Sequence, residues 1–468
     1  MLILISFLTG KDDSNAAFFR GKKESPWYVV AFGMIGASLS GVTFISVPGW
    51  VASSQFGYMQ MVMGYLAGYL VIGLVLMPLY YRLNLTSIYG YLEQRFGYWS
   101  YKTGAFYFLL SRVIGASFRL YLVAIALHIA VFEPMRLPFW LAVLVAVVLI
   151  WVYTFRSGIK TIIWTDTLQT ASMLLAVGVT IWVISDSFDW TFTELVGQIN
   201  QSSYSKWFFW DDWNNDQHFI KQFLGGMFIT ISMTGLDQDM MQKNLSCRNI
   251  REAQRNMFWF SIVLVFANLL FLSLGALLYM FSDVAGFAEV AGDELYPTLA
   301  LSGELGLMAG VLFIIGLVAA AYSSADSALT ALTTSFCVDF LGMDKAPKPN
   351  DKQTRKWVHI GFSALLFVVI LVFKNINDDS VIAELFKVAG FTYGPLLGLY
   401  SFGLLTKRSV NDKWVPLVAV LSPALCYVLQ QNSFDWFDGY KIGFELLLIN
   451  GLVTTFGLYL ISYRNIAK

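Results

Sequence analysis

The sequence has little charge. Asp, Glu, Lys and Arg make up 13% of its 468 residues, whereas a soluble globular domain carries about 25%. The 31 basic and 31 acidic residues cancel, so no net field favours nucleic acid or an acidic partner. The composition therefore argues against a soluble globular chain and against a nucleic-acid-binding protein.

Cysteine and histidine are also scarce. The cysteines stand far apart at Cys247, Cys337 and Cys426, and the histidines at His128, His218 and His359. Neither set has the spacing of a disulfide framework, a redox motif or a zinc site. We therefore expect no disulfide and no histidine-based metal site.

Long apolar runs take the place of charge, and hydrophobic residues make up 57% of the chain. The run Phe258–Leu278, for example, contains no charged residue. An α-helix of about 20 residues crosses ~30 Å of hydrocarbon. The runs show none of the period-two alternation of a membrane β-barrel. The sequence predicts an all-α membrane protein.

About twelve full spans are expected when the apolar runs are read against their breaks. They lie near residues 27–52, 57–80, 100–132, 137–155, 161–185, 217–236, 256–282, 305–340, 356–373, 381–405, 412–430 and 440–463. Most Lys and Arg residues fall in one set of alternate loops, which includes Arg82, Lys243 and Arg251. The positive-inside rule places these loops in the cytoplasm. It predicts a multi-pass protein of the cell inner (plasma) membrane with a cytoplasmic C-terminus.

The first span contains small and hydroxyl residues where a membrane helix is usually apolar. Residues Gly36–Thr43 read GASLSGVT, and Pro48-Gly49 follows them. Gly and Pro loosen a helix, and each carbonyl they free must be satisfied by packing, water or an ion. Close helix packing through small residues explains the same pattern, so this segment alone leaves both interpretations open.

A polar face runs through the eighth span. Its members, at i, i+3, i+4 and i+7, are Ser323, Asp326, Ser327 and Thr330. Asp326, like Asp166 in the fifth span, is a carboxylate that is costly at membrane depth unless it is paired or bound to an ion. A hard cation held by carboxylate, hydroxyl and carbonyl oxygens is one interpretation. Hydrogen bonds between helices are the other.

Two basic residues lie at membrane depth, where a charged side chain is costly unless it is paired or reaches water. Arg112 and Arg119 are seven residues apart and share one face of the third span. Each could contact an anionic solute, pair with an acid or extend its head to the interface; we predict structural pairing or snorkelling for both. After the sixth span, Asp237–Lys243 is interpreted as a polar exit into a basic cytoplasmic loop.

These polar segments together resemble one transporter family. They are Ala320-Ala321-Tyr322-Ser323-Ser324, Trp164-Thr165-Asp166, Asp237-Gln238 with Gln242, and Tyr393-Gly394-Pro395-Leu396-Leu397-Gly398-Leu399. On these motifs the chain resembles the sodium:solute symporter family over essentially its whole length. The resemblance implies the leucine-transporter-like fold, with two inverted five-helix repeats plus flanking helices.

This fold implies a division of the chain. Residues 1–26 would be the remnant of an N-terminal helix and a cytoplasmic loop, and 27–185 the first inverted repeat (spans one to five). An extracytoplasmic loop, 186–216, would precede the second repeat, 217–405 (spans six to ten), and two accessory spans, 406–468. Breaks in spans one and six, five positions apart in the order, fit such a repeat with a site at the midplane.

The resemblance also implies cation sites. The sodium site common to the family falls on Gly36, Leu39, Ala320, Ser323 and Ser324, the first three through carbonyls and the serines through hydroxyls. The second sodium site of some members falls on Asp166, Ser323, Asp326 and Ser327. Asp326 departs from the neutral residue of the family pattern, so it strengthens a cation site or carries a proton. We expect one or two sodium ions.

The implied solute site lies between spans one and six. Its residues are Ser38, Ser40, Thr43, Thr230 and Met233. The substrate specificities known in the family cannot be transferred to this chain. In sugar carriers, amide side chains hold the hexose, and the corresponding positions here carry hydroxyl side chains. The arginine that binds the sialic acid carboxylate aligns with Gly115. Small hydroxylated residues suit a polar solute without naming it.

The expected function is sodium-coupled symport of a small polar organic solute (sugar, polyol, sugar acid or amino-acid-like) into the cell by alternating access. Two alternatives stay open. One is a proton-coupled carrier of the same fold, since Asp166 and Asp326 are titratable; the other is a non-transporting solute sensor.

An enzyme is not expected, because the spacing of Ser, Asp and His residues gives no nucleophile–base pair. The expected partners are the solute, sodium ions and the lipid bilayer, and the sequence does not give the oligomeric state.

Overall fold

The computed structural model describes residues 25–154, 159–344, 348–374 and 381–463, and these are almost entirely helical. The α-helices are α3 (Trp27–Ser38), α4 (Gly41–Ser54), α5 (Tyr58–Val71), α6 (Met77–Arg82), α7 (Gly90–Arg95), α8 (Tyr98–Leu127), α9 (Phe139–Thr154), α10 (Ile159–Ser187), α11 (Phe192–Gln201), α12 (Phe219–Thr230), α13 (Gln238–Leu245), α14 (Ile250–Ala285), α15 (Leu295–Leu301), α16 (Gly306–Ser335), α17 (Asp351–Phe373), α18 (Val381–Leu405), α19 (Val415–Trp436) and α20 (Leu446–Leu460). The π-helical turns are η2 (Ile72–Leu76), η3 (His128–Phe132), η4 (Ile231–Gly235) and η6 (Phe336–Phe340), and the 3-10 turns are η5 (Gly292–Glu294) and η7 (Asp412–Trp414). Strands β1 (Ser409–Val410) and β2 (Ser462–Tyr463) pair antiparallel.

Many of these helices are long and apolar enough to cross a membrane. Within the described residues, eight helices meet that length and composition, and two bent pairs raise the number to ten. The bent pairs are α3 with α4, which turn by 55°, and α12–η4 with α13, which turn by 64°. Shorter apolar helices cover 139–151 and 446–460. The all-helical membrane class is confirmed, and the count of about twelve spans stays a prediction.

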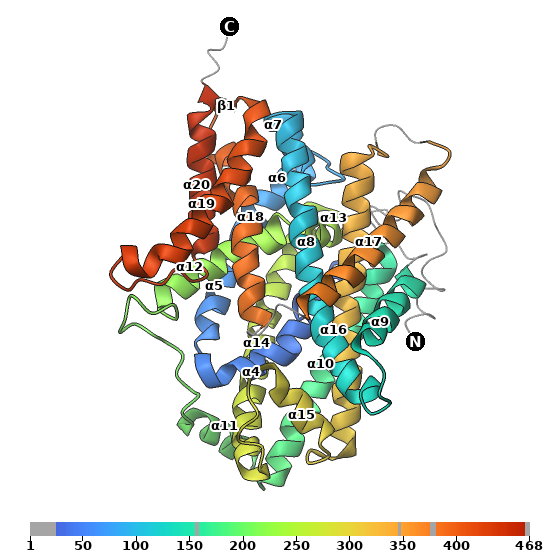
Figure 1. The fold of residues 1–468 in the computed structure, drawn as a ribbon, viewed down its shortest axis with the longest axis vertical. Helices are drawn as coiled ribbons and strands as arrows, with labels where there is room; N and C mark the ends of the chain where they lie inside the picture. The colour runs from blue at the N-terminus through green and yellow to red at the C-terminus, as the bar shows by residue number, and fades with distance from the viewer. Residues whose placement is uncertain (1–24, 155–158, 345–347, 375–380, 464–468) are drawn as a thin grey trace.

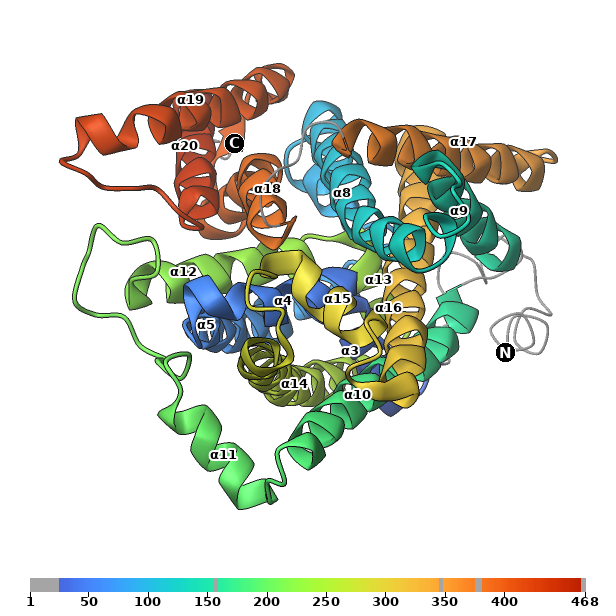
Figure 2. The same ribbon diagram turned by 60° about the horizontal axis from the view of Figure 1, so that its bottom comes forward.

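The two bent pairs lie together at the centre of the molecule (Figures 1 and 2). Helices α5, α8, α10, α14, α16 and α18 pack around them. Helices α9 and α17 lie on one flank, and α19 and α20 on the opposite flank (Figure 2). The breaks of both central helices are therefore enclosed by other helices.

The ends of the bundle differ in the loops they carry. Helices α6 and α7 and strand β1 lie at one end, called here the α7 end, and α11 and α15 lie at the other (Figure 1). Arg82 and Arg95 belong to the helices of the α7 end, and Asp293 and Glu294 belong to the turn before α15. This separation of basic from acidic loops agrees with the predicted partition. The placement of the α7 end in the cytoplasm stays a prediction.

The first break follows from the local sequence. Helix α3 ends at Ser38, Leu39 leaves the helical conformation, and Ser40 is extended before α4 begins. Gly36 permits close packing in the last turn of α3, since a Cβ there would collide with Thr170 Oγ1 of α10. The small residues therefore do both things considered for them, because they pack the helices closely and they open the helix.

Candidate functional site

A cavity lies where the α3–α4 break faces α12 and η4. It measures about 90 Å³ as the space open to the centres of water-sized spheres. All five residues predicted for the solute site line it, namely Ser38, Ser40, Thr43, Thr230 and Met233. The structure thus brings together residues that stand almost 200 positions apart in the chain.

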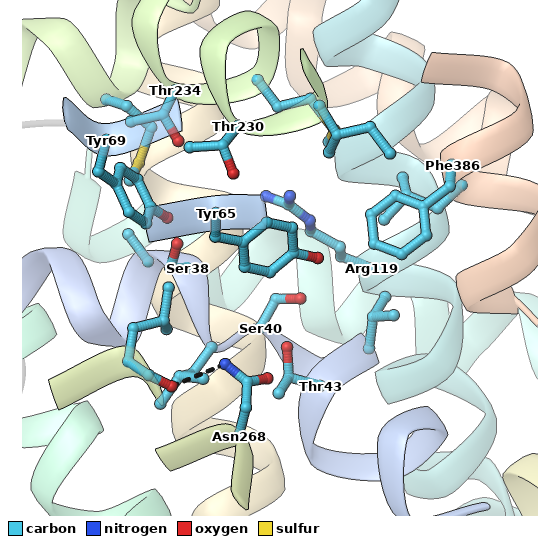
Figure 3. Close-up of a pocket in the computed structure, with 18 of the residues that line it drawn as sticks. Ser38, Ser40, Thr43, Tyr65, Tyr69, Arg119, Thr230, Thr234, Asn268 and Phe386 are labelled. Carbon is cyan, nitrogen blue, oxygen red and sulfur yellow. Dashed lines mark hydrogen bonds between the residues drawn. The ribbon is translucent and has the colours of Figure 1, made fainter. Parts of the chain in front are cut away.

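Several polar lining residues were not predicted. They are Tyr58, Tyr65, Tyr69, Thr234 and Asn268. Figure 3 shows Tyr65, Tyr69 and Asn268 around Ser38, Ser40 and Thr43. The Tyr58 and Tyr65 hydroxyls lie 2.9 Å apart, seven residues along one face of α5. Asn268, a lone amide in the apolar run of α14, carried a signal that sequence reasoning passed over.

Arg112 of α8 is paired at the edge of this cavity. Its guanidinium forms an ion pair with Asp239, and Nη1 lies 3.8 Å from Asp237 Oδ2. The hydroxyl of Tyr393 in α18 donates to Asp237 Oδ2 at 2.6 Å. Asp237 also caps α13, because its Oδ1 accepts from the Asp239 N–H at 2.9 Å. The predicted structural pairing is confirmed for Arg112, and its partners join α8, α13 and α18.

Arg119 differs from Arg112. Among the described residues it has neither an ion-pair nor a hydrogen-bond partner, and its Nε is buried without one. Figure 3 shows its guanidinium pointing into the cavity between Tyr65 and Thr230. The prediction of pairing or snorkelling is wrong for Arg119, since its side chain faces the cavity.

The α12–α13 break is held by groups from the α7 end. Tyr80 and Tyr89 donate their hydroxyls to the carbonyls of Gly235 (2.8 Å) and Leu236 (3.0 Å). The Gln238 side chain accepts from the Ile88 N–H at 2.9 Å and donates to the Thr86 carbonyl at 3.0 Å. The carbonyls freed by this break are therefore occupied, as a buried backbone requires.

The α3–α4 break is not held in this way. Within the described residues, no backbone or side-chain donor reaches the carbonyls of Gly36 or Leu39, because the Ser40 N–H donates to Ser38 and the Leu39 N–H to Ile35. The buried Ser324 Oγ in α16 also has no hydrogen-bond partner. All three oxygens belong to residues predicted for the common sodium site. A hard cation prefers ligands of this kind, carbonyl and hydroxyl oxygens.

The remaining residues of that predicted site are buried beside it. A Cβ built on Gly36 would lie 3.3 Å from Ser323 Oγ, which places α3 against α16. Ala320 and Leu39 are 2% and 1% exposed. Ser323 Oγ donates to Asp166 Oδ1 at 2.7 Å, so this hydroxyl is already engaged. The residues present fit a sodium ion with Ser324 as the free hydroxyl ligand.

Asp166 has a cation of its own. Lys243 Nζ lies 2.7 Å from Asp166 Oδ2, and both side chains are fully buried. The interpretation of Asp237–Lys243 as a polar exit into a loop is wrong, because this segment is buried from Asp237 to Lys243 and forms α13. The charge of Lys243 alone could not predict that it is buried, since its ion-pair partner Asp166 stands 77 positions earlier in the chain.

Three of the four residues predicted for the second sodium site lie together. Ser323 donates a hydrogen bond to Asp166, and the Ser327 side chain interacts with the same carboxylate. Asp326 Oδ1 accepts from the Ser327 N–H at 2.5 Å, and both residues are buried in α16. The ammonium group of Lys243 already balances the charge of Asp166 at this place.

The sequence matches known transporters along its length. It is 25% identical over 467 residues to the sodium/sialic acid symporter NanT of Aliivibrio fischeri, which covers 96% of this chain and 89% of that relative. It is 24% identical to the sodium/sialic acid symporter SiaT of Proteus mirabilis, over 97% of this chain and 92% of that relative.

The fold has a counterpart among solved structures. A Na+-coupled sialic acid symporter in a substrate-bound outward-open state superposes with a TM-score of 0.81 at 20% identity, covering 98% of this chain and 94% of that one. At this identity the likeness shows the fold alone, which is the leucine-transporter-like arrangement. The relatives are multi-pass membrane transporters and not enzymes.

A family-wide match completes the comparison. The sequence profile described as the sodium:solute symporter family matches residues 18–411, a range that contains both broken helices, the cavity and α16. The chain belongs to the sodium:solute symporter family.

Proposed function

We propose that this protein couples the entry of sodium to the uptake of a small polar organic solute by alternating access. The observation that carries the proposal is the set of open oxygens at the first break. The carbonyls of Gly36 and Leu39 and the hydroxyl of Ser324 have no partner among the described residues, and Leu39 lines the solute cavity. Sodium at Gly36, Leu39, Ala320, Ser323 and Ser324 would satisfy them.

The two ligands would share one structural element. Ser38 and Ser40 line the cavity from the stretch of chain that contains the Leu39 carbonyl. An ion bound between this stretch and α16 would fix the position of the solute ligands, so binding of either ligand would favour binding of the other. Such coupling must be reciprocal in the binding free energies. This is the thermodynamic requirement for symport.

The organisation proposed for the chain follows the same logic. Residues 27–185 and 217–405 would form the two inverted repeats, each contributing one broken helix, with 186–216 as the extracytoplasmic loop between them. The two breaks then meet at a common site, and movement of one repeat against the other would expose it to each side in turn.

A second sodium at Asp166, Ser323, Asp326 and Ser327 would compete with Lys243. The acid can be balanced by the tethered ammonium or by a free ion, and two cations on one carboxylate would repel each other. We propose that a second ion binds there only after Lys243 has left Asp166.

Thermal stability in matched salts tests the proposal. The purified protein should melt at a higher temperature in sodium chloride than in potassium or choline chloride, because sodium binds the folded state alone. Ser324→Ala should remove most of this difference. The control is Ser261→Ala, since the Ser261 hydroxyl donates only to Phe258 in its own helix.

Uptake into proteoliposomes completes the test. Solute accumulation should follow an inward sodium gradient and should fall with Ser324→Ala but not with Ser261→Ala. Uptake driven equally well by a proton gradient without sodium would instead support the proton-coupled carrier. A solute that binds without being accumulated would support a sensor.

A further inference from the structure

We propose that a cavity outside the solute path binds one phospholipid molecule, and that the headgroup of this lipid carries an ammonium group. The cavity lies between the loop that precedes α12 and the turn that joins α19 to α20, and it measures about 420 Å³. Its described lining residues and those of the solute cavity have no member in common. The inference therefore depends neither on sodium nor on the identity of the solute.

The walls of this cavity are apolar. Among its described lining residues, Asn214 is the one with a side chain that is neither aliphatic nor aromatic; the others are Leu429, Ile442, Ile449, Trp213, Phe437 and Tyr440. A cavity of about 150 Å³ with walls of this kind stays dry and binds benzene. A larger space with the same walls is suited to a hydrocarbon chain and not to water.

One wall continues the surface that α19 presents to the membrane. Helix α19 is long and apolar enough to cross the bilayer, and 22% of its apolar stretch is buried within the protein. The side chains of Leu425 and Val428 are 59% and 49% exposed. Leu429 follows them and lies seven residues, roughly 10 Å, before the end of the helix at Trp436. Hydrocarbon that covers α19 therefore reaches the cavity without crossing a polar barrier.

The opposite wall has the composition of a membrane interface. Trp and Tyr gather where the hydrocarbon meets the headgroups. Trp213 and Phe437 are 52% and 50% exposed at the rim, and Tyr440 lies in the turn between them and α20. The cavity thus extends from the level of a spanning helix to a rim of aromatic rings. An acyl chain and its headgroup occupy the same two levels in a bilayer.

The charges beside the rim select the headgroup. The Asn214 N–H donates to the carboxylate of Asp212 at 2.9 Å, and the Asn214 side chain donates to the Asp438 carbonyl at 3.4 Å. Asp212, Asp438 and Lys441 are exposed. Two carboxylates and one ammonium group therefore stand next to lining residues. A headgroup with a phosphate and an ammonium group matches both signs, whereas an anionic headgroup meets more negative charge than positive charge.

The cavity is fastened to the second broken helix. Lys221 of α12 is 3% exposed, and its Nζ lies 3.7 Å from the centre of the Tyr440 ring. This ammonium group also donates to the carbonyls of Asn214 at 3.3 Å and Lys441 at 3.2 Å. Both walls are thereby tied to α12. A lipid between them would strengthen the attachment of α12 to the α19–α20 pair, so it should stabilise the folded protein.

The experiment adds defined lipids to the purified, delipidated protein in detergent. Phosphatidylethanolamine should raise the melting temperature by about 2–4 °C, because it binds the folded state alone. Phosphatidylglycerol with the same acyl chains should have a clearly smaller effect. Native mass spectrometry should find one phosphatidylethanolamine molecule retained by each protein chain.

Two variants of α20 locate the effect. Ile449→Trp fills the cavity and should remove most of the shift in melting temperature together with the retained lipid. Leu452→Trp is the matched control, since Leu452 lies on the same helix, is 59% exposed and does not line the cavity. This control should respond to phosphatidylethanolamine like the unmodified protein.

A second pair of variants serves if Ile449→Trp does not fold. Trp213→Ala removes an aromatic wall in the loop and should weaken the lipid shift. Trp210→Ala removes a ring from the same loop that is 54% exposed and does not line the cavity, so the shift should persist.

Three results would overturn the proposal. Equal lipid shifts in the cavity variant and its matched control would mean that general contact with lipid stabilises the protein. Equal shifts from the two lipids would remove the role of the ammonium group. A second copy of the chain, bound in place of lipid and lost in Ile449→Trp, would identify the cavity as a contact between subunits.

Discussion

The two broken helices at the centre of this protein satisfy their backbones in opposite ways. In the α12–α13 break, the hydroxyls of Tyr80 and Tyr89 occupy the carbonyls of Gly235 and Leu236. In the α3–α4 break, the carbonyl of Leu39 receives no donor from the described residues. A break is therefore not a binding site in itself. The break with occupied oxygens is called here the fixed joint, and the break with open oxygens is the one at which we propose that sodium binds.

The charges near the two breaks show the same contrast. Arg112 is neutralised by Asp237 and Asp239 at the second break. Arg119 stands seven residues further along α8, and among the described residues it has no hydrogen-bond or close ion-pair partner. Both arginines share a helix and a face, so helix position does not distinguish them. What distinguishes them is direct contact with carboxylates, because Asp237 and Asp239 form their ion pairs with Arg112.

Removal of Arg112 should have the largest effect on stability. Arg112→Met would leave Asp237 and Asp239 buried without their cation, and breaking a buried ion pair in this way costs about 3–5 kcal/mol. We expect a strongly reduced melting temperature and reduced yield of folded protein. Fluorescence-detected size-exclusion chromatography and thermal unfolding of the purified protein measure both.

Arg119→Met is the matched variant for this prediction, because it removes the same side chain from the same face of α8. The two variants should move the melting temperature in opposite directions. Equal destabilisation by both would erase the difference that we draw between the two arginines.

Removal of Lys243 should come next. Lys243→Met leaves the buried carboxylate of Asp166 without its cation, which costs about 3 kcal/mol. Sodium should then partly restore stability, since the ion can take the place of the ammonium group. Melting curves at increasing sodium concentration should show a steeper dependence for Lys243→Met than for the unmodified protein.

Lys206→Met supplies the control. Lys206 pairs with Asp211 in an exposed loop, with side chains 48% and 88% exposed. Exposed pairs contribute about 0–1 kcal/mol, so this variant should melt almost normally and show no added dependence on sodium. An unchanged sodium response in Lys243→Met would argue against any exchange between Lys243 and a second ion.

Removal of the Tyr393 hydroxyl should have a moderate effect. Tyr393→Phe takes from Asp237 a hydrogen bond of 2.6 Å and leaves the ion pair with Arg112 in place. A hydrogen bond to a charged group contributes about 1.5–3 kcal/mol. The melting temperature should fall by less than in Arg112→Met. A fall in melting temperature as large as that of Arg112→Met would mean that the Tyr393 hydroxyl, and not the Arg112 guanidinium, contributes most of the stability of the α12–α13 break.

The sequence allows good prediction of features that depend on local composition. Apolar runs such as Phe258–Leu278 predicted the membrane helices, and the small residues at Gly36–Thr43 indicated the position of the first break. The family motifs then led to the five predicted solute residues, all of which line one cavity. Each of these features is recorded in a few neighbouring residues.

Features that depend on distant pairing were missed. Lys243 was placed in a loop because charge near a span end usually indicates one, yet its partner Asp166 lies in α10. The tyrosines that occupy the second break stand about 150 positions before the carbonyls they bind. Arg119 was expected to pair like Arg112, because sequence shows which charges exist and not which acids the fold brings near them.

The smallest predicted effect gives the sharpest contrast between the two breaks. Tyr89→Phe removes a neutral hydrogen bond to the Leu236 carbonyl and should cost about 1 kcal/mol of stability. It should leave the stabilisation by sodium unchanged, because that oxygen belongs to the fixed joint. Ser324→Ala should behave in the reverse way, with little loss of stability in potassium and a clear loss of the sodium effect, since Ser324 Oγ has no partner to lose. If Tyr89→Phe weakened the sodium response as much as Ser324→Ala does, both breaks would act on the ion, and the distinction between an occupied and an open break would no longer explain where sodium binds.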